Sequence, residues 1–245
     1  MSMSNVPNSF RYTPDLLEEY ATAAFDNAKN LINEAQLILS YGNLGRAYFL
    51  AVAAIEEIGK SFIAFDARGR NLKDSAVTAK IHNSFENHTI KINSAFHAFF
   101  LSHGDLRNEL QGIIDLMIAL KYGREPSMYT DINYKTGKIK RPEDLVREKA
   151  AKDCIRLAQH CYYKNLKYQQ TVPPTQRSAH EDEFYGMKSK KTNELFNNED
   201  FWWFLIANME AGENDLSKSV VLYKREYLDK GKKFKTADQE SNDDT

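Results

Sequence analysis

Residues 56–61, Glu-Glu-Ile-Gly-Lys-Ser, are the part of the sequence whose residue types best suit chemistry. They place three charges within a segment that is otherwise apolar for several helical turns. On a helical wheel Lys60 projects between Glu56 and Glu57, and Arg46 returns to within about 20° of Glu57. Because an unpaired buried charge costs several kcal/mol, these side chains must face one another, a partner helix or a cleft.

Two interpretations of this charged stripe remain open. In the first, Arg46, Glu57 and Lys60 form an ion-pair network that faces the third helix and fixes the register of a bundle. In the second, they line a polar site in which the carboxylates tune the lysine or bind a cationic group. A phosphate-binding P-loop is excluded, because its earlier glycine would fall at Ala54 and amides inside a helix are already bonded.

His88 and Lys91 are a second group of candidates, since a spacing of three residues puts them on one helical face. An imidazole beside a cation suits acid–base chemistry, although a lone helical histidine is also compatible with a structural or exposed position. The sequence contains no Glu-x-x-His pair, which argues against a ferritin-like di-metal bundle. We therefore expect neither a metal site nor a cofactor.

A long irregular segment, residues 122–141, supplies the third group. Loops of this length in a compact domain are usually functional or disordered, and basic residues interleaved with tyrosines suit single-stranded RNA. An ordinary solvated loop is the alternative, and a third option is that Arg124 and residues 129–131 fold back onto the stripe of Glu57 and Lys60. The candidate substrate-binding residues of this segment are Tyr129, Asp131, Lys135, Lys138 and Lys140.

Helices are the elements predicted to position all of these residues. Thr13-Pro14 offers an N-cap followed by a proline at the first helical position, and apolar residues then recur at three- and four-residue steps as far as Tyr41. A second helix over residues 44–68 is apolar on most faces, which indicates the centre of a bundle. Further helices are predicted over residues 81–103, 105–120, 142–170, 201–206 and 216–227.

The predicted fold class is therefore all-α, because no period-two run is long enough to suggest a sheet. A flexible N-terminus is expected to precede one main helical domain. After a proline-containing linker, a C-terminal helical extension is expected to pack on the bundle and to end in a disordered tail. These parts correspond to residues 1–12, 13–170, 171–190, 191–230 and 231–245.

Composition limits the cellular setting. Lysine and arginine (33) nearly balance aspartate and glutamate (34), so any contact with RNA must come from a local patch. Cys154 and Cys161 are about 10 Å apart on a helix, too far for a disulfide, and therefore indicate a reducing compartment. No run reaches the roughly 18 apolar residues of a membrane span, and no signal peptide is evident. We expect a cytoplasmic protein that does not enter a membrane.

Taken in order along the chain, several of these motifs resemble the AbiV family of bacterial anti-phage abortive-infection proteins, which belongs to the HEPN group of helical domains. The resemblance covers roughly residues 12–170 and implies a HEPN-like helical bundle. It further implies a homodimer that senses a phage component and halts growth or translation of the infected cell. The motifs are Arg46-Ala47, residues 54–60, His88 with Lys91, Arg124, residues 128–131 and Pro142.

Many HEPN proteins are metal-independent ribonucleases whose signature is an arginine, a spacer of four to six residues and a histidine. The spacers from Arg156 to His160 and from Arg177 to His180 are shorter, so RNA cleavage by this chain would have to use other groups. Such cleavage needs a base for the 2′-hydroxyl, an acid for the leaving oxygen and a cation for the phosphorane.

For that chemistry His88 is the predicted acid or base, with Lys60, Lys91 and Arg124 as phosphate stabilisers and Glu57 orienting them. Arg46 and Glu56 are added to the loop residues as candidate substrate contacts.

The rival hypothesis is a non-catalytic helical interaction protein that binds the translation machinery or a phage protein. A third hypothesis is a regulatory partner of a separate toxin. Self-association is predicted to involve Phe96, Phe99 and Phe100.

Overall fold

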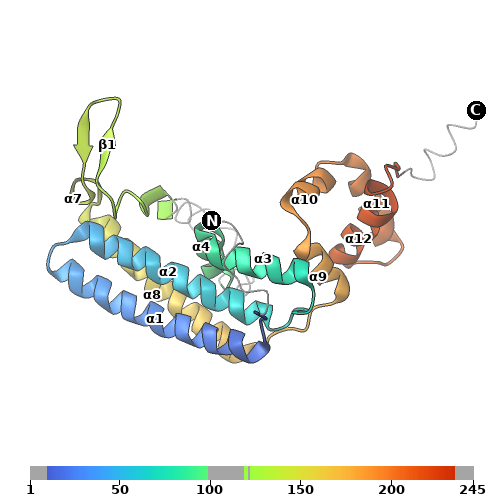
Figure 1. Cartoon of the computed structure of the whole chain (residues 1–245), viewed down its shortest axis with the longest axis horizontal. Coiled ribbons are helices and arrows are strands. Elements are labelled where there is room, and N and C mark those ends of the chain that lie inside the picture. The colour runs from blue at the N-terminus through green and yellow to red at the C-terminus, as the bar shows by residue number, and fades with distance from the viewer. Residues whose placement is uncertain (1–9, 99–118, 121, 235–245) are drawn as a thin grey trace, which may run out of the picture. The chain divides into compact units, whose positions relative to one another are not determined.

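The computed structural model of the chain describes residues 10–98, 119–120 and 122–234 (Figure 1). These residues form helices joined by turns, together with one two-stranded hairpin, which confirms the predicted all-α class. They fall into two compact units, the first made of the described residues up to 69 and from 81 to 175, and the second of residues 70–80 and 176–234. No helix in the described ranges has the length and apolar character that crossing a membrane requires.

Helix α1 (Pro14–Ser40) begins where the sequence predicts, because the Thr13 hydroxyl accepts a hydrogen bond from the Leu16 amide at 3.2 Å. The chain leaves the helix through Gly42, whose φ of 77° favours glycine. The buried side of α1 is rich in alanine, and these small residues let α1 pack closely on α2. They are Ala21, Ala24, Ala28 and Ala35.

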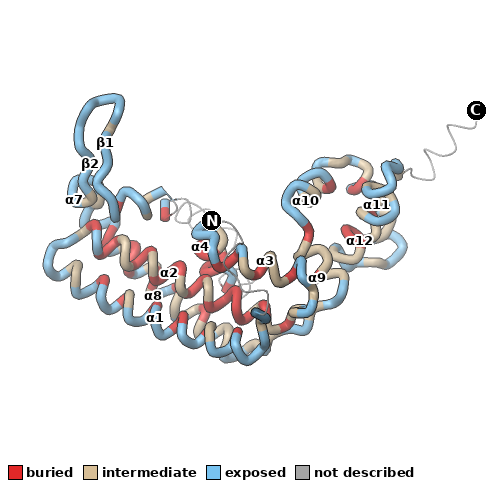
Figure 2. The backbone as a smooth tube through the Cα atoms, viewed as in Figure 1, coloured by how far each residue is buried: buried red, intermediate tan, exposed pale blue. Residues whose placement is uncertain are grey.

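Helix α2 (Leu44–Ala67) is the centre of the first unit, as its apolar sequence predicts. It packs against α1, α4 (His88–Ala95), α7 (Pro142–Leu145) and α8 (Glu148–Thr171). Figure 2 shows buried residues along most of its length. A Cβ on Gly59 would lie 1.8 Å from the carbonyl oxygen of Lys91, so only glycine lets the backbone of α4 lie directly on α2.

The predicted third helix is divided into two, α3 (Ser75–Glu86) and α4. Asn87 adopts an extended conformation at the break, and its side chain accepts a hydrogen bond from the Ile90 amide at 3.1 Å. An asparagine that caps a new helix competes with continuation of the old one. The prediction of one continuous helix was therefore wrong, and the break puts His88 and Lys91 in the first turn of α4. Residues 99–118, with the predicted helix after Asp105, lie outside the described residues.

The segment expected to be irregular contains an antiparallel hairpin of β1 (Asp131–Asn133) and β2 (Lys138–Lys140), which the sequence did not predict. Its turn ends at Gly137, which has a φ of 68° and donates its amide hydrogen bond to the Asn133 carbonyl at 2.8 Å. Each strand spans three residues, too few for a period-two pattern to be recognised.

The helix predicted from Pro142 to Gln170 forms α7 and α8, separated by an extended Val146. Helix α8 buries Cys154 and Cys161, and both thiols are free, as expected. Phe96 lies in the same core and is fully buried, so it offers no surface for self-association. Phe99 and Phe100, the other residues of that prediction, lie outside the described residues.

The second unit has a core of its own, formed by α10 (Ser189–Phe196), α11 (Glu199–Glu210), α12 (Leu216–Tyr223) and the π-helical turn Lys224–Leu228. Helix α9 (Ala179–Gly186) occupies the middle of the segment expected to be a linker. A reciprocal capping box between Ser178 and Glu181 starts this helix. The core residues of the unit are Met187, Leu195, Phe201, Val220 and Tyr223.

Candidate functional site

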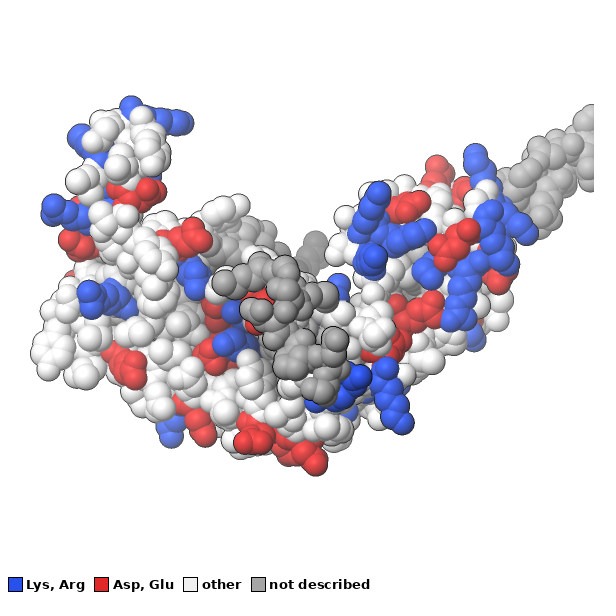
Figure 3. Space-filling view, viewed as in Figure 1, with Lys and Arg blue, Asp and Glu red and all other residues white. Residues whose placement is uncertain are grey.

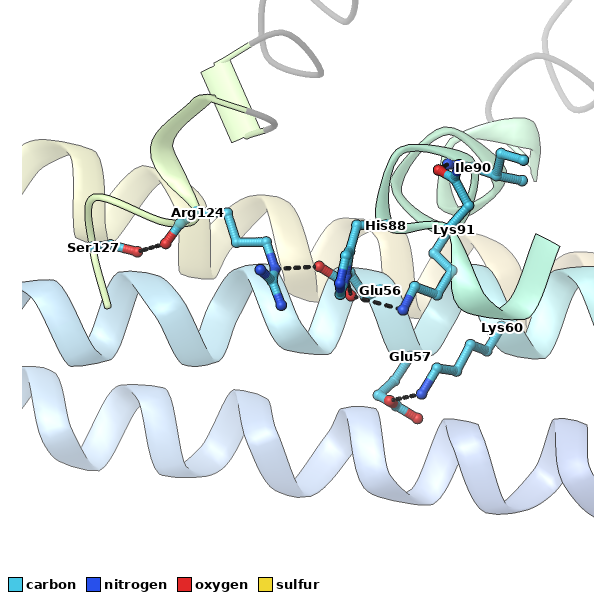
Figure 4. Close-up of polar contacts among 9 residues, drawn as sticks. Glu56, Glu57, Lys60, His88, Ile90, Lys91, Arg124 and Ser127 are labelled. Carbon is cyan, nitrogen blue, oxygen red and sulfur yellow. Dashed lines mark hydrogen bonds and ion pairs between the residues drawn. The ribbon is translucent and has the colours of Figure 1, made fainter. Parts of the chain in front are cut away.

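A buried carboxylate, that of Glu56, is the centre of the polar contacts on α2 (Figure 4). Its Oε2 atom is 2.7 Å from Nδ1 of His88 and 3.2 Å from Nζ of Lys91. Its Oε1 atom is 2.7 Å from Nε of Arg124. We call these four residues the Glu56 cluster. It joins α2, the first turn of α4 and the turn that carries Arg124.

The local sequence explains how the cluster is assembled. Gly59, one turn beyond Glu56, lets α4 approach so closely that Lys91 reaches the carboxylate. On the other side, the Arg124 amide donates to the Leu120 carbonyl at 3.2 Å, and the Ser127 hydroxyl donates to the Arg124 carbonyl at 2.6 Å. These bonds form a compact turn that directs the guanidinium toward Glu56.

Gly123 fits this turn against α2. A Cβ on Gly123 would lie 2.5 Å from the Tyr48 hydroxyl, so the missing side chain allows the close approach. The Tyr48 hydroxyl also donates to the Ala119 carbonyl at 3.5 Å. Tyr48 is buried, which raises the pKa of its phenol and keeps it protonated.

The surroundings of Glu56 keep it ionised. Burial alone would raise the pKa of this carboxyl, because it disfavours the charged form. The hydrogen bond with His88 and the charges of Lys91 and Arg124 outweigh burial and hold the pKa below its ordinary value. An ionised carboxylate only accepts hydrogen bonds, so His88 donates from Nδ1, and in the neutral form of the ring this leaves the lone pair on Nε2.

His88 is the most accessible member of the cluster. Its side chain is 52% exposed, whereas that of Lys91 is 7% exposed and that of Arg124 22%. Within the described part of the chain no hydrogen bond occupies Nε2 of His88. The arrangement is thus an oriented imidazole with one free nitrogen beside a guanidinium, and it can exchange a proton with a ligand that the cations hold.

Glu57 and Lys60 form a separate pair, with 2.6 Å between Oε1 and Nζ. The pair lies on the side of α2 toward α1 (Figure 4) and has Tyr20 in its electrostatic surroundings. Burial would lower the pKa of Lys60, but the hydrogen bond and charge of Glu57 raise it above its ordinary value. Neither residue joins the Glu56 cluster.

The predicted network of Arg46 with Glu57 and Lys60 does not form. Arg46 is exposed and makes no ion pair with any described residue. The helical wheel gave the correct direction, but Arg46 and Glu57 are eleven residues apart, which is about 16 Å along a helix axis. Side chains at that separation cannot meet.

Apart from Arg124, the loop candidates lie in the hairpin or, for Tyr129, just before it, and they do not contribute to the Glu56 cluster. Arg124 does fold back onto α2, although it meets Glu56 rather than the predicted Glu57 and Lys60. Figure 3 shows lysine and arginine side chains over the hairpin. The remaining candidates are all exposed: Tyr129, Asp131, Lys135, Lys138 and Lys140.

The sequence reasoning chose Glu57 as the orienting carboxylate and made Glu56 only a substrate contact. A signal for Glu56 existed, because it shares a helical face with Val52 and Gly59, both of which are buried. In the described ranges no three His, Cys, Asp or Glu side chains are grouped so that they could hold a metal ion.

Comparison with known proteins identifies the family. No curated protein and no solved structure matches the chain. A family model described as AbiV, of the HEPN type, matches residues 16–163, which is more than half of the 245 residues. The matched range contains the whole Glu56 cluster and ends before the C-terminal part of the second unit, which begins at residue 176. The chain therefore belongs to the AbiV family of HEPN proteins.

Proposed function

We propose that this protein is an abortive-infection effector that arrests growth or translation of a phage-infected cell by cleaving RNA at the Glu56 cluster. Membership of the AbiV family supports the abortive-infection role. The observation that carries the chemistry is the half-exposed His88, held through Nδ1 by a buried carboxylate that also holds Arg124.

In the proposed reaction, Nε2 of His88 takes the proton of a ribose 2′-hydroxyl while that oxygen attacks the adjacent phosphorus. Glu56 stabilises the imidazolium that results, and Arg124 stabilises the charge that develops on the phosphoryl oxygens. The bond from phosphorus to the 5′-oxygen breaks, and the imidazolium returns its proton to that oxygen. The products are a 2′,3′-cyclic phosphate and a 5′-hydroxyl.

The test is incubation of purified protein with total RNA, with analysis of the new 3′ ends. We expect cyclic-phosphate ends from the wild type and a loss of at least about 100-fold for His88→Ala, the usual contribution of one acid–base group. His160→Ala is the matched control, because His160 is exposed and lies in the shortened Arg-spacer-His motif of α8. Loss of cleavage in His160→Ala with full activity in His88→Ala would refute the assignment.

A non-catalytic interaction protein is the second candidate, and the burial of Lys91 and Glu56 favours it. Two buried opposite charges that join α4 to α2 are also what a purely structural ion pair would show. In that case the protein acts by binding RNA, a ribosome-associated target or a phage protein. Phage protection by His88→Ala at the wild-type level, without RNA cleavage by either protein, would favour this alternative.

RNA binding is proposed to involve the exposed lysines of the hairpin, Lys135, Lys138 and Lys140. A homodimer and a phage protein as trigger remain part of the proposal, on the strength of the family alone.

A further inference from the structure

The surface of α11 in the second unit is the most apolar exposed helix face among the described residues, and it lies outside the family match. Trp202, Trp203, Ile206 and Met209 are 46%, 43%, 44% and 54% exposed. Their positions span an arc of about 120° around the helix, with Met209, Trp202 and Ile206 in one row. We call these four residues the α11 stripe. Two half-exposed tryptophans on one helix suggest a binding surface.

Both indole rings are held in place without a partner. Nε1 of Trp202 donates to the Phe196 carbonyl at 2.9 Å, and its ring packs on Phe196 and Phe201 with centroids 5.8 and 5.2 Å away. Nε1 of Trp203 donates to Oε1 of Glu199 at 3.3 Å. Because the N–H groups are already bonded, each indole presents apolar ring surface, and little side-chain entropy remains to be lost on binding.

Acidic residues lie at both ends of the stripe. Helix α11 contains Glu199, Asp200 and Glu210 and no lysine, arginine or histidine. Glu199 and Glu210 project at about 60° and 80° on the wheel, between Ile206 and Trp203, at opposite ends of the helix. On the face of α11 these carboxylates disfavour nucleic acid and anionic lipid, and they favour a partner that surrounds its apolar residues with positive charge.

Two occupants that the chain itself could supply, a second α11 and the C-terminal residues, are not complementary to the stripe. A second α11 would bring three like charges against three, since its charged residues are all acidic. Residues 235–245 contain four acidic residues, one lysine and no large apolar side chain. Neither supplies both the positive charge and the apolar area that the stripe lacks.

We propose that the α11 stripe docks an amphipathic helical segment of another protein, with apolar residues in a row and lysine or arginine along their edges. The apolar row of the partner helix would pack against the α11 stripe, as when amphipathic helices bind apolar grooves. The lysine or arginine residues along the edge of the partner helix would pair with Glu199 and Glu210. The proposal is independent of the chemistry at the Glu56 cluster.

Tryptophan fluorescence of the full chain tests it, because Trp202 and Trp203 are the only two tryptophans in the sequence. The probe is a synthetic helical peptide without tryptophan, with leucine at i, i+3, i+4 and i+7 and lysine on the flanks. A comparison peptide has glutamate in place of each lysine. We expect a saturable blue shift with the lysine peptide, weakening with salt, and at least about tenfold weaker binding of the glutamate peptide.

Two variants locate the binding. Ile206→Lys and Glu210→Lys should each weaken binding of the lysine peptide by about tenfold or more. Ile139→Lys and Glu143→Lys are matched controls in the first unit, also at exposed positions, and should bind as the wild type does. Far-UV circular dichroism checks that every variant is folded, and two independent exposed positions guard against a local folding defect.

Three results would overturn the proposal. They are equal affinity for the lysine and glutamate peptides, an equal loss of affinity for the lysine peptide in the control variants, and no change in the tryptophan emission spectrum on adding either peptide. A blue shift that depends on protein concentration without peptide, with a dimer in light scattering, would assign the stripe to a second copy instead.

Discussion

Substitution of Glu56 by glutamine is expected to destabilise the first unit strongly, although it replaces only one heavy atom of the side chain. The carboxylate neutralises Lys91, whose side chain is 7% exposed. Removing one partner of a buried ion pair costs about 3–5 kcal/mol, because the other charge is left buried. Glutamine retains an oxygen that can accept from Arg124, so we expect a loss of about 3 kcal/mol. The melting temperature should fall by about 6–12 °C.

Glu57→Gln is a matched control, because it makes the same change at the next position of the same helix. Glu57 and Lys60 are 17% and 23% exposed and pair within one turn, so water and salt screen their attraction. Such pairs contribute about 0.2–1 kcal/mol. Urea denaturation followed by far-UV circular dichroism should show a difference of about 2 kcal/mol or more between the two variants. Equal losses would refute the assignment of Glu56 as the buried centre.

A double variant identifies the source of the loss. If the cost of Glu56→Gln arises from a stranded cation, adding Lys91→Met should recover most of it, since methionine fills similar space without charge. A double variant no more stable than Glu56→Gln would show that the loss has another cause.

The remaining predictions concern the hairpin, the thiols and pH. Replacing Lys135, Lys138 and Lys140 with alanine should reduce the slope of log RNA affinity against log salt concentration by about 2, since each lost phosphate contact on a single strand removes about 0.7. Gel shifts at several salt concentrations measure this slope, and an unchanged slope would mean that RNA binds elsewhere. Burial raises the pKa of both Cys154 and Cys161, so iodoacetamide should label them only after unfolding, as mass spectrometry can check. Folding lowers the pKa of Glu56, so the stability that its charge gives the protein should be full above its ordinary pKa, about 4.3, and should be lost as the pH falls further. In denaturation experiments at pH 3 to 7, the unfolding free energies of the wild type and Glu56→Gln should converge at the acid end. Burial raises the pKa of Tyr12 to about 12, and the hydrogen bond and charge of Glu57 raise the pKa of Lys60 despite its burial. The stability linked to both groups should therefore be full below pH about 10 and be lost as the pH rises further, which promotes alkaline unfolding.

The sequence predicted the elements that are specified locally. Helix α1 was predictable because its proline and its alanine face lie within the helix and its cap, Thr13, immediately precedes it. Helix α2 was predictable because it is apolar on most sides. The break at Asn87 was not, because apolar positions continue across it at helical spacing from Phe85 to Ile92. Whether an asparagine caps a new helix there depends on how α4 packs on α2, and a linear pattern does not contain that information.

The site was predictable in composition but not in arrangement. Every member of the Glu56 cluster was a candidate from the sequence, yet the carboxylate that orients them was assigned to Glu57. A helical wheel gives the direction of each side chain around one axis. It does not give the side from which another helix approaches, and here α4 approaches over Gly59, on the face of Glu56. It also omits axial distance, which separates Arg46 from Glu57.

Activity of the double variant Glu56→Gln with Lys91→Met separates the two accounts of the cluster. Glu56 fixes α4 to α2 and also holds His88, so loss of function in Glu56→Gln alone is expected whether the cluster is structural or catalytic. The double variant should be folded, but its His88 would face a neutral amide that stabilises an imidazolium far less than a carboxylate does. If the cluster cleaves RNA, the folded double variant should therefore remain inactive and fail to protect against phage. If it only holds the bundle together, protection should return in proportion to the recovered stability, and His88→Ala should protect as the wild type does.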